Sequence, residues 1–498
     1  MLYHLPKRTS AFELTLPFED AGTPAYRQLY EALRSQILDG RLGTGARLPA
    51  TRDLARQYQL SRGTIVNAFE LLKSEGYLEG SIGSGTYVSK VLPDQLLQVG
   101  NHGQRAGNRQ TAEQRKRRRW SQYATRLKAF PAFDSRPARA FRANIPAVDL
   151  FPSSLWAQIA ARRLRRGSTN LLLGCDPMGY RPLQEAIADY LITSRAVRCA
   201  PEQIAILSGV QEALDLVARL FLNPGDRVCM ENPGYIGAAI TFESVGAKIS
   251  TMGLDDEGMA LRASGLRGAR LVYVTPGHQF PLGILMSLPR RLQLLEWARK
   301  TGALIFEDDY DSEYRYSGRP VPALQGLDRN GSVLFAGSFS KVLFPSLRLG
   351  YLVVPPDLVD YFAAAKSGSS RHAPMLDQAV LCDFIAEGHF GRHLRRMRGV
   401  YAERLSVLLR SARERLAGSL DVSGVQAGLQ TVGWLRAGIT GLSVARAAAA
   451  RNVDVIPLSS YTRGRATREG LQLGFAAVDP SEIRRGVNEL AMVLKAAR

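Results

Sequence analysis

Residues 337–350 read GSFSKVLFPSLRLG and place a lysine, Lys341, just after an apolar run, 333–336, that is typical of a buried strand. The hydroxyls of Ser338 and Ser340 lie beside this lysine, and Arg348 follows seven residues later. A lysine in such a loop can form a Schiff base with an aldehyde, and hydroxyl and guanidinium groups are donors that suit a phosphate. The alternative for this segment alone is a surface lysine in a serine-rich loop.

The segment IFEDDY, residues 305–310, ends a second predicted strand. Because side chains alternate between the two faces of a strand, we expect Asp308 and Tyr310 to share one face and Asp309 to lie on the other. A carboxylate can keep a pyridine nitrogen protonated, and a phenol can hydrogen-bond to a ring oxygen, so the pair suits a pyridine cofactor that acts as an electron sink. The alternative is a solvated acidic strand end.

Two further loops could complete such a site. SGVQEAL, residues 208–214, places Ser208, Gly209 and Val210 between a predicted strand and a helix, where free backbone N–H groups can hold a phosphate. ENPGY, residues 231–235, places Tyr235 after another strand, where its ring could stack on a flat cofactor. Taken singly, the first pattern occurs in many α/β loops, and a tyrosine in the second position more often serves packing.

From about residue 141 onward, apolar runs alternate with amphipathic helical stretches, which predicts an α/β domain with a mainly parallel sheet. The expected strands are 204–207, 227–230, 271–275, 303–307, 333–336 and 351–354. The four cysteines are scattered, and His389 and His393 lie among arginines, so we expect no disulfide framework and no metal site. Neither a signal peptide nor a membrane span is expected, and the predicted compartment is the cytoplasm.

Residues 20–90 predict a smaller, helical domain. Leu29, Leu33 and Ile37 form an apolar stripe on a first helix, about 25–39, that Gly40 should end. Thr51 and Ser61 are expected to be the N-caps of two further helices, 52–58 and 62–75. A β-hairpin with glycines 80, 83 and 85 in its turn follows. This is the pattern of a winged helix-turn-helix; the alternative is a small helical domain for protein interaction.

The positive charge is densest between these two parts. Residues 91–140 hold 11 Lys and Arg against 3 Asp and Glu, whereas residues 1–90 hold 11 against 9, and the whole chain has a net charge of +20. The segment includes the run 115–119 (RKRRR) and shows no clear periodicity. We therefore predict a basic flexible linker over 91–140, whose run either touches DNA phosphates or is a solvated tether.

The N-terminal motifs resemble the GntR-type winged helix over about residues 25–89, in the segments LPATRDLA (48–55), LSRGTIV (60–66), LLKSEGYL (71–78) and GSGTYV (83–88). This resemblance implies double-stranded DNA as a partner. It further implies that Arg52 and Arg62 contact the DNA, with Gly63, Thr64 and the wing-tip Gly85 in support.

The C-terminal motifs, in their order, resemble fold-type I enzymes that depend on pyridoxal 5′-phosphate (PLP), the aspartate aminotransferase family, over about 145–497. Narrower matches are GYRPLQEAI (179–187), TPGHQFPLG (275–283) and EDDYDSEYRY (307–316). With a GntR domain and a long linker, the chain is similar to the MocR subgroup of GntR regulators. The resemblance implies the Schiff base on Lys341, Asp308 against the pyridinium, Tyr310 on O3′, Tyr235 stacked on the ring and His278 near the pocket. The implied phosphate cup consists of Ser208, Gly209, Val210, Ser338, Ser340 and Arg348.

Three positions depart from the family pattern. Phe280 stands where the aminotransferases have an asparagine that contacts O3′, and Gln472 stands where they have the arginine that binds the substrate carboxylate. A neutral amide cannot replace a bidentate guanidinium, so ordinary transamination of α-amino acids is not expected. Gly237 replaces an effector-binding arginine of some subgroup members, which argues against 4-aminobutyrate as a ligand.

The resemblance thus predicts a homodimeric regulator that binds an operator and responds to PLP or to a small amine or amino-acid effector, with at most residual or partial transamination. The alternatives are a working aminotransferase with an accessory DNA-binding domain and a cofactor-free dimerisation scaffold.

Overall fold

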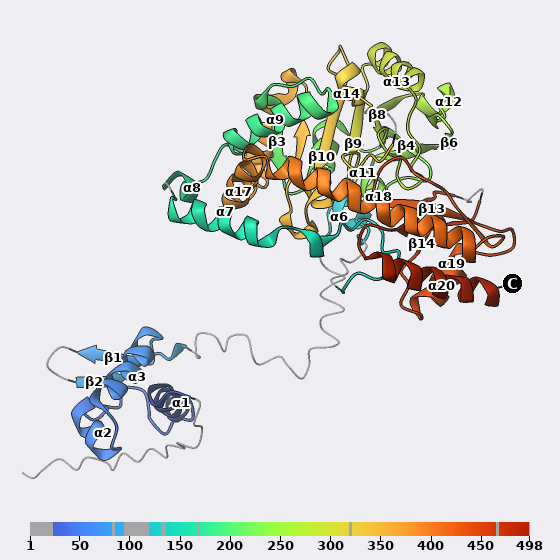
Figure 1. Ribbon diagram of the computed structural model, residues 1–498. Coiled ribbons are helices and arrows are strands. Elements are labelled where there is room, and N and C mark those ends of the chain that lie inside the picture. Colours follow the sequence, from blue (N-terminus) through green and yellow to red (C-terminus); the bar gives the residue numbers. More distant parts are fainter. Residues whose placement is uncertain are drawn as a thin grey trace, which may run out of the picture. The chain divides into compact units, whose positions relative to one another are not determined.

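The computed structural model describes residues 23–81, 85–93, 119–130, 136–167, 169–317, 321–464 and 468–497 (Figure 1). The chain divides into two compact units, residues 1–119 and 120–498. The expected boundaries 20–90, 91–140 and 141–498 remain a prediction, because residues 94–118 and 131–135 of the expected linker lie outside the described residues.

The smaller unit is a winged helix-turn-helix. Three helices, α1 (Ala25–Leu38), α2 (Thr51–Gln57) and α3 (Arg62–Ser74), precede the antiparallel strands β1 (Leu78–Ser81) and β2 (Gly85–Val88). The predicted stripe on α1 is buried together with apolar residues of α3, which forms one core beneath the hairpin. Gly80 and Gly85 belong to the strands rather than to the turn, since Gly80 pairs with Thr86 and Ser81 pairs with Gly85.

One of the two predicted N-caps is confirmed and the other is wrong. The Ser61 side chain accepts a hydrogen bond from the Thr64 backbone N–H at 3.0 Å, as the capping rule requires. Thr51, in contrast, is the first residue of α2, and the extended Ala50 occupies the cap position without a side-chain hydrogen bond. The helix has Asp53 in its first turn instead, a charge that the helix dipole favours.

The end of the expected linker has structure of its own. Residues Gln122–Arg126 form helix α6, capped by the Ser121 side chain. Lys128 forms an ion pair at 2.7 Å with Glu243, a residue of helix α11 (Ile236–Ser244). The sequence did not predict this helix because a five-residue segment is too short to show a helical period.

The larger unit is built on a seven-stranded sheet with the strand order β3-β11-β10-β9-β8-β4-β5. β11 runs opposite to the other six strands, so the sheet is mainly parallel, as predicted. All six predicted strands are present, with ends that differ by at most two residues: β3 (Ile204–Leu207), β4 (Arg227–Glu231), β8 (Ala269–Val274), β9 (Leu304–Asp309), β10 (Val333–Ser338) and β11 (Gly350–Val353). The seventh strand, β5 (Lys248–Met252), was not predicted.

Helices cover both faces of this sheet because its strands are apolar on both sides. One core packs the sheet against α10 (Val210–Phe221), α11 and α16 (Val359–Gly368). On the other face, α9 (Arg181–Arg195), α17 (Met375–Ala386) and α18 (His389–Arg415) pack on one part of the sheet, and α13 (Leu288–Thr301) packs on another. Helix α7 (Ser153–Arg165) packs against α17. The shorter elements are α8 (Thr169–Leu173), α12 (Ala263–Leu266), α14 (Leu324–Leu327), α15 (Phe339–Val342), β6 (Leu254–Asp255) and β7 (Gly258–Met259).

A second, antiparallel sheet completes the larger unit. Its strand order is β12-β13-β15-β14, from β12 (Leu420–Val422), β13 (Gln430–Leu435), β14 (Ile456–Pro457) and β15 (Gly470–Gly474). Helices α18, α19 (Gly441–Ala449) and α20 (Pro480–Ala496) lie beside it (Figure 1). No helix of the described part of the chain is long and apolar enough to cross a membrane.

Candidate functional site

A cavity of about 270 Å³ lies where the parallel strands of the large sheet end. This edge, at the carboxyl ends of the strands, is where open α/β sheets hold their ligands. The walls come from the ends of β8, β9 and β10, from the segments that follow them and β4, from the starts of α10 and α11, and from three more distant residues, Phe130, Asn144 and Tyr461. The lining residues are Phe130, Asn144, Val210, Tyr235, Ile236, Tyr273, Phe280, Asp308, Tyr310, Ser338, Lys341 and Tyr461.

Lys341 lies in the single turn of α15, which directly follows β10. Its Nζ donates a hydrogen bond to the backbone oxygen of Asn144 at 2.7 Å. Burial lowers the pKa of the Lys341 ammonium to about 8, because the charged form loses its hydration. The lysine therefore has a larger neutral, nucleophilic fraction near neutral pH than an exposed lysine has.

Asp308, at the end of β9, is the buried acid of the cavity. Its Oδ2 accepts a hydrogen bond from the Tyr273 hydroxyl at 2.6 Å, whereas Oδ1 is buried without a partner among the described residues. Burial raises the pKa of the Asp308 carboxyl to about 7. A buried oxygen without a donor is unfavourable, so this atom suits a ligand that brings an N–H group.

Tyr310 lies two residues beyond Asp308 and lines the same cavity, as the alternation along the strand predicts. Its hydroxyl is 3.1 Å from Nδ1 of His278, and the same ring nitrogen is 2.8 Å from Oδ1 of Asp311. Asp311 can only accept when it is ionised, so Nδ1 then carries the proton; Tyr310 cannot donate to a protonated Nδ1, and its own proton stays free for a ligand. His278 thus contacts Tyr310 without lining the cavity itself.

The loop before α10 provides a backbone cradle. Gly209 has a φ of 135°, and a Cβ at this position would lie 3.6 Å from the Arg348 guanidinium, so the arginine lies against the glycine. Ser208 is turned elsewhere, because its hydroxyl and its backbone N–H both donate to Glu212 at 2.7 Å. Glu212 also forms an ion pair with the fully buried Lys366 at 3.2 Å.

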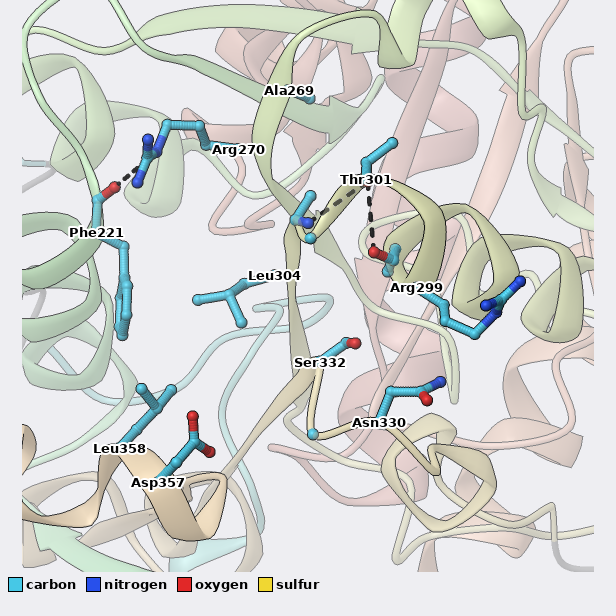
Figure 2. A pocket seen from close by; sticks show the side chains of 14 residues that line it. Phe221, Ala269, Arg270, Arg299, Thr301, Leu304, Asn330, Ser332, Asp357 and Leu358 are labelled. Atoms are coloured by element: carbon cyan, nitrogen blue, oxygen red, sulfur yellow. Dashed lines mark hydrogen bonds between the residues drawn. The ribbon is translucent and has the colours of Figure 1, made fainter.

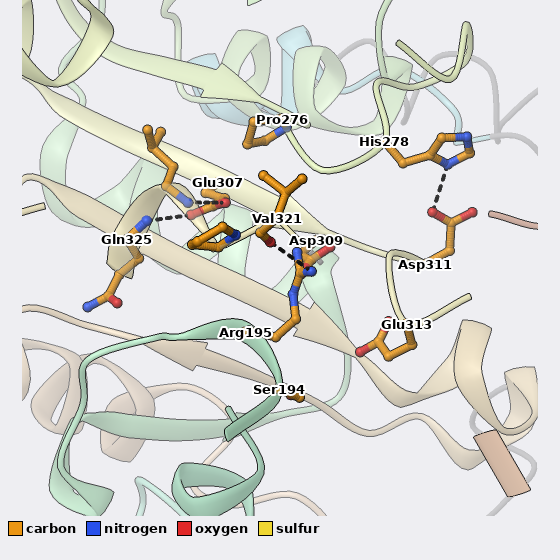
Figure 3. A network of polar contacts seen from close by, with 12 residues as sticks. Ser194, Arg195, Pro276, His278, Glu307, Asp309, Asp311, Glu313, Val321 and Gln325 are labelled. Carbon is orange, nitrogen blue, oxygen red and sulfur yellow. Dashed lines mark hydrogen bonds and ion pairs between the residues drawn. The ribbon is translucent and has the colours of Figure 1, made fainter. Parts of the chain in front are cut away.

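The residue beside Asp308 belongs to a different, buried network (Figure 3). Asp309 faces away from the cavity and forms an ion pair with Arg195 at 2.7 Å, with both side chains less than 10% exposed. Glu307, on the same face, accepts hydrogen bonds from the backbone N–H groups of Leu324 and Gln325 at 2.8 and 2.9 Å. These contacts fix the end of β9 and thereby the position of Asp308.

Another wall of the cavity is aromatic. The ring of Phe280 packs edge-on against Tyr235, Tyr310 and Tyr461 at centroid distances between 5.0 and 5.8 Å. Tyr461 donates a hydrogen bond at 2.8 Å to Oε1 of Gln472, which is fully buried on β15. Phe280 and Gln472, two positions where the sequence departs from its family, therefore both contact Tyr461.

In the smaller unit, the predicted DNA-contacting residues lie at the start of α2 (Arg52), at the start of α3 (Arg62, Gly63 and Thr64) and in the wing (Gly85). Arg52, Arg62 and Gly63 are exposed, Thr64 is half-buried, and the Thr64 hydroxyl lies 2.8 Å from that of Ser61. Gly85, in the wing, has a φ of 116°, and a Cβ there would lie 3.0 Å from the Arg47 side chain. Arg47 is an exposed cation at the wing that the sequence pattern alone did not single out.

The structure thus brings Lys341, Asp308, Tyr310, Tyr235, Val210 and Ser338 into one cavity. Ser340 is adjacent, with its hydroxyl buried and without a described partner. Tyr273, Asn144 and Tyr461 were missed. Tyr273 could have been found, because it lies near the end of the predicted strand 271–275, whereas the loop residues Asn144 and Tyr461 give no such signal.

A second pocket lies at the opposite edge of the same sheet (Figure 2). Its lining includes Ala269 and Leu304 at the starts of β8 and β9, and Ser332 just before β10. It is therefore remote from Lys341 and contains none of the predicted site residues. Within the described ranges, no cluster of three or more His, Cys, Asp or Glu residues could hold a metal ion.

Comparisons with known proteins agree with both units. Residues 142–490 match the family model of aminotransferase class I and II, and residues 25–88 match that of bacterial regulatory proteins of the GntR family. The chain is 42% identical to the probable rhizopine catabolism regulatory protein MocR of Rhizobium meliloti, over 95% of this chain and 94% of the relative. It is 33% identical to the uncharacterized HTH-type transcriptional regulator YhdI of Bacillus subtilis (strain 168), over 95% and 97%.

Among solved structures, the chain is similar to LysN, the α-aminoadipate aminotransferase of Thermus thermophilus, in complex with N-(5′-phosphopyridoxyl)-L-leucine. The two share 30% sequence identity and a TM-score of 0.69, over 76% of this chain and 97% of that one. Both parts of the chain, and their order, are thus accounted for by one kind of protein. The chain belongs to the MocR subgroup of the GntR family of transcriptional regulators, in which a winged helix-turn-helix precedes an aminotransferase class I and II domain.

Proposed function

We propose that the larger unit binds PLP through Lys341. An amine effector then competes with Lys341 for the cofactor and thereby changes how the winged helix binds DNA. The observation that carries the proposal is the cavity itself, which holds a buried lysine and a buried carboxyl with one unpartnered oxygen among the described residues. The structural similarity to an aminotransferase complexed with a phosphopyridoxyl amino acid supports the same cofactor.

The residues present fit this cofactor. When bound, PLP supplies an aldehyde that condenses with primary amines and a pyridine ring that withdraws electrons. Asp308 would accept the ring N–H at its free Oδ1, and Tyr310 would donate to the ring hydroxyl. Tyr235 would cover the ring face. The backbone of Gly209 and Val210, the hydroxyls of Ser338 and Ser340 and the guanidinium of Arg348 would hold the phosphate.

Two of the residue roles that the family resemblance implies, those of Ser208 and His278, need adjustment. Ser208 acts through Glu212, since that carboxylate takes both of its donors and is itself neutralised in part by Lys366. His278 acts on Tyr310 rather than on the cofactor, because it contacts the phenol and lies outside the cavity lining. In this proposal both are positioning residues.

The winged helix supplies the operator contacts. The N-terminus of α3 carries Arg62, Gly63 and Thr64 and can enter the major groove. Arg52, at the start of α2, and the wing around Gly85 would add contacts. We propose that two copies of the chain dimerise in the cytoplasm and present two such heads to two half-sites. The effector regulates only if it binds the DNA-competent and DNA-incompetent arrangements with different affinity.

A working aminotransferase is the second candidate, because Lys341, Asp308 and Tyr310 all line the cavity. Gln472 argues against it, since the side chain at the carboxylate-binding position is a neutral amide. Sustained turnover of an amino donor with a keto-acid acceptor would favour the enzyme. Binding of an amine without turnover would favour the regulator.

The test uses the full chain and three proteins: wild type, Lys341→Ala, and Lys300→Ala as a control at an exposed lysine. We expect wild type and Lys300→Ala to show the visible absorption band of lysine-linked PLP and Lys341→Ala to lack it. Binding to DNA from the region beside the protein's own gene should change with PLP in the first two proteins only. A band in Lys341→Ala, or DNA binding that ignores PLP in wild type, would refute the proposal.

A further inference from the structure

Tyr461, which lines the cavity, is hydrogen-bonded to Gln472. Gln472 stands where the aminotransferase family has the arginine that binds the substrate carboxylate. The Tyr461 hydroxyl donates its proton to Oε1 of Gln472, so the tyrosine oxygen presents only lone pairs to the cavity. Nε2 of Gln472 is buried without a partner among the described residues. The side of the cavity at Tyr461 is therefore polar and uncharged.

Among the described residues, the cationic groups near the cavity are already engaged. Of the residues that line it, only Lys341 and Asp308 are ionisable at neutral pH, and the proposed function assigns both to the cofactor. Arg348 lies against Gly209, on the side assigned to the phosphate. Arg463 follows Tyr461 closely, but its guanidinium forms an ion pair with Glu243, which Lys128 also contacts.

A carboxylate placed beside Tyr461 would meet an acceptor, and Nε2 of Gln472, which has no partner in the described part of the chain, is a neutral donor. Among the described residues that line the cavity, no cation is left to pair with the carboxylate. Burying such a charge without a partner costs far more than burying a neutral hydroxyl, which can donate to the tyrosine oxygen. The aromatic rings of Phe280, Tyr235 and Tyr310 around it also favour a ligand with apolar faces.

We propose that the effector is a primary amine that carries a neutral hydroxyl where an amino acid carries its carboxylate, and that Gln472 sets this preference by holding Tyr461 as an acceptor. This inference rests on the proposed function. With PLP bound, the effector nitrogen would take the place of the Lys341 nitrogen on the aldehyde carbon of the cofactor, one carbon–nitrogen double bond replacing the other. Lys341 would leave as a free amine that carries the two protons given up by the effector nitrogen, so no oxidant or water would be needed.

Matched pairs of probes that differ only in this group test the inference: L-leucine against L-leucinol, and L-serine against 2-amino-1,3-propanediol. The readout is the dissociation constant of each probe from the change in the visible band of the PLP-loaded full chain. In wild type we expect the amino alcohol to bind at least about tenfold more tightly than its amino acid, because an unpaired buried charge costs more than about 1.4 kcal/mol.

Two variants locate the preference. Gln472→Arg should reverse it in favour of the amino acids, and Tyr461→Phe should reduce it, while Tyr361→Phe, at an exposed tyrosine, should leave it unchanged. Amino acids that bind wild type as tightly as the alcohols, a band that neither series shifts, or a Gln472→Arg variant with the wild-type ratio would overturn the inference. A wild-type protein without any PLP band would instead refute the proposed function.

Discussion

Replacing Asp308 by asparagine should stabilise the PLP-free protein at alkaline pH, although it removes a residue of the proposed site. The Asp308 carboxyl has a pKa of about 7 in the folded chain because it is buried, against 3.8 for the ordinary group. The folded state thus holds its proton more tightly than the unfolded state does. Stability therefore falls as pH rises from about 4 to about 7 and levels off above that.

The magnitude follows from the difference between the two pKa values. At about 1.36 kcal/mol per pKa unit, the carboxyl lowers the free energy of unfolding by about 1.5 kcal/mol at pH 5 and by about 4 kcal/mol at pH 8. Asparagine removes this term and keeps an acceptor for Tyr273, but its buried N–H groups cost about 1–3 kcal/mol at any pH. The difference in stability between variant and wild type should rise by roughly 2.5 kcal/mol between pH 5 and pH 8.

Urea unfolding followed by tryptophan fluorescence measures this quantity, since all four tryptophans, Trp120, Trp156, Trp297 and Trp434, lie in the larger unit. Asp309→Asn is the matched control. It breaks the buried ion pair with Arg195 and should destabilise the unit by about 3–5 kcal/mol at both pH values. A difference between Asp308→Asn and wild type that stays constant with pH would refute the reasoning.

Three other changes test the cofactor site and the winged helix. Arg348→Ala should raise the PLP dissociation constant roughly 10- to 100-fold, because the phosphate loses a charge-assisted hydrogen bond. Fluorescence titration with PLP measures this constant, and an unchanged affinity would contradict the prediction. The rate of PLP capture should increase with pH and level off above about 8, because burial lowers the pKa of Lys341 to about 8 and only the neutral amine reacts. A capture rate, measured by stopped-flow absorbance, that does not rise between pH 6 and pH 8 would disprove this. Arg62→Ala should weaken operator binding roughly 5- to 150-fold in a mobility-shift assay, whereas the exposed Arg27→Ala on α1 should not, and equal losses would count against a contact from α3.

Much of the site could be predicted because its residues follow strands. The apolar runs before Asp308 and Lys341 locate the strand ends, and the two-residue period places Asp308 and Tyr310 together and Asp309 apart. The same reasoning could not reach Asn144, whose backbone oxygen receives the Lys341 hydrogen bond from 197 residues away in a loop without periodicity. Long-range contacts of this kind depend on tertiary packing, which a local pattern does not encode.

The Ser208 hydroxyl illustrates a second limit. Its position in the loop before α10 is the predicted one, but Glu212, one helical turn on, takes its hydrogen bonds. Residue type and spacing give the donors that a loop offers. Residue type and spacing do not say which acceptor of the folded chain these donors will bind. The same limit applies to Thr51. It is a good capping residue, but the cap position of α2 is taken by the extended Ala50, so Thr51 lies in the first turn of the helix.

The most direct test of the proposed cofactor site is to reduce the PLP-loaded full chain with borohydride, digest it and locate the pyridoxyl group by mass spectrometry. We predict that the modified peptide contains Lys341 and that an excess of a binding amine, added before reduction, protects this lysine. Modification at another lysine, or at none, would contradict the claim that this cavity holds the cofactor.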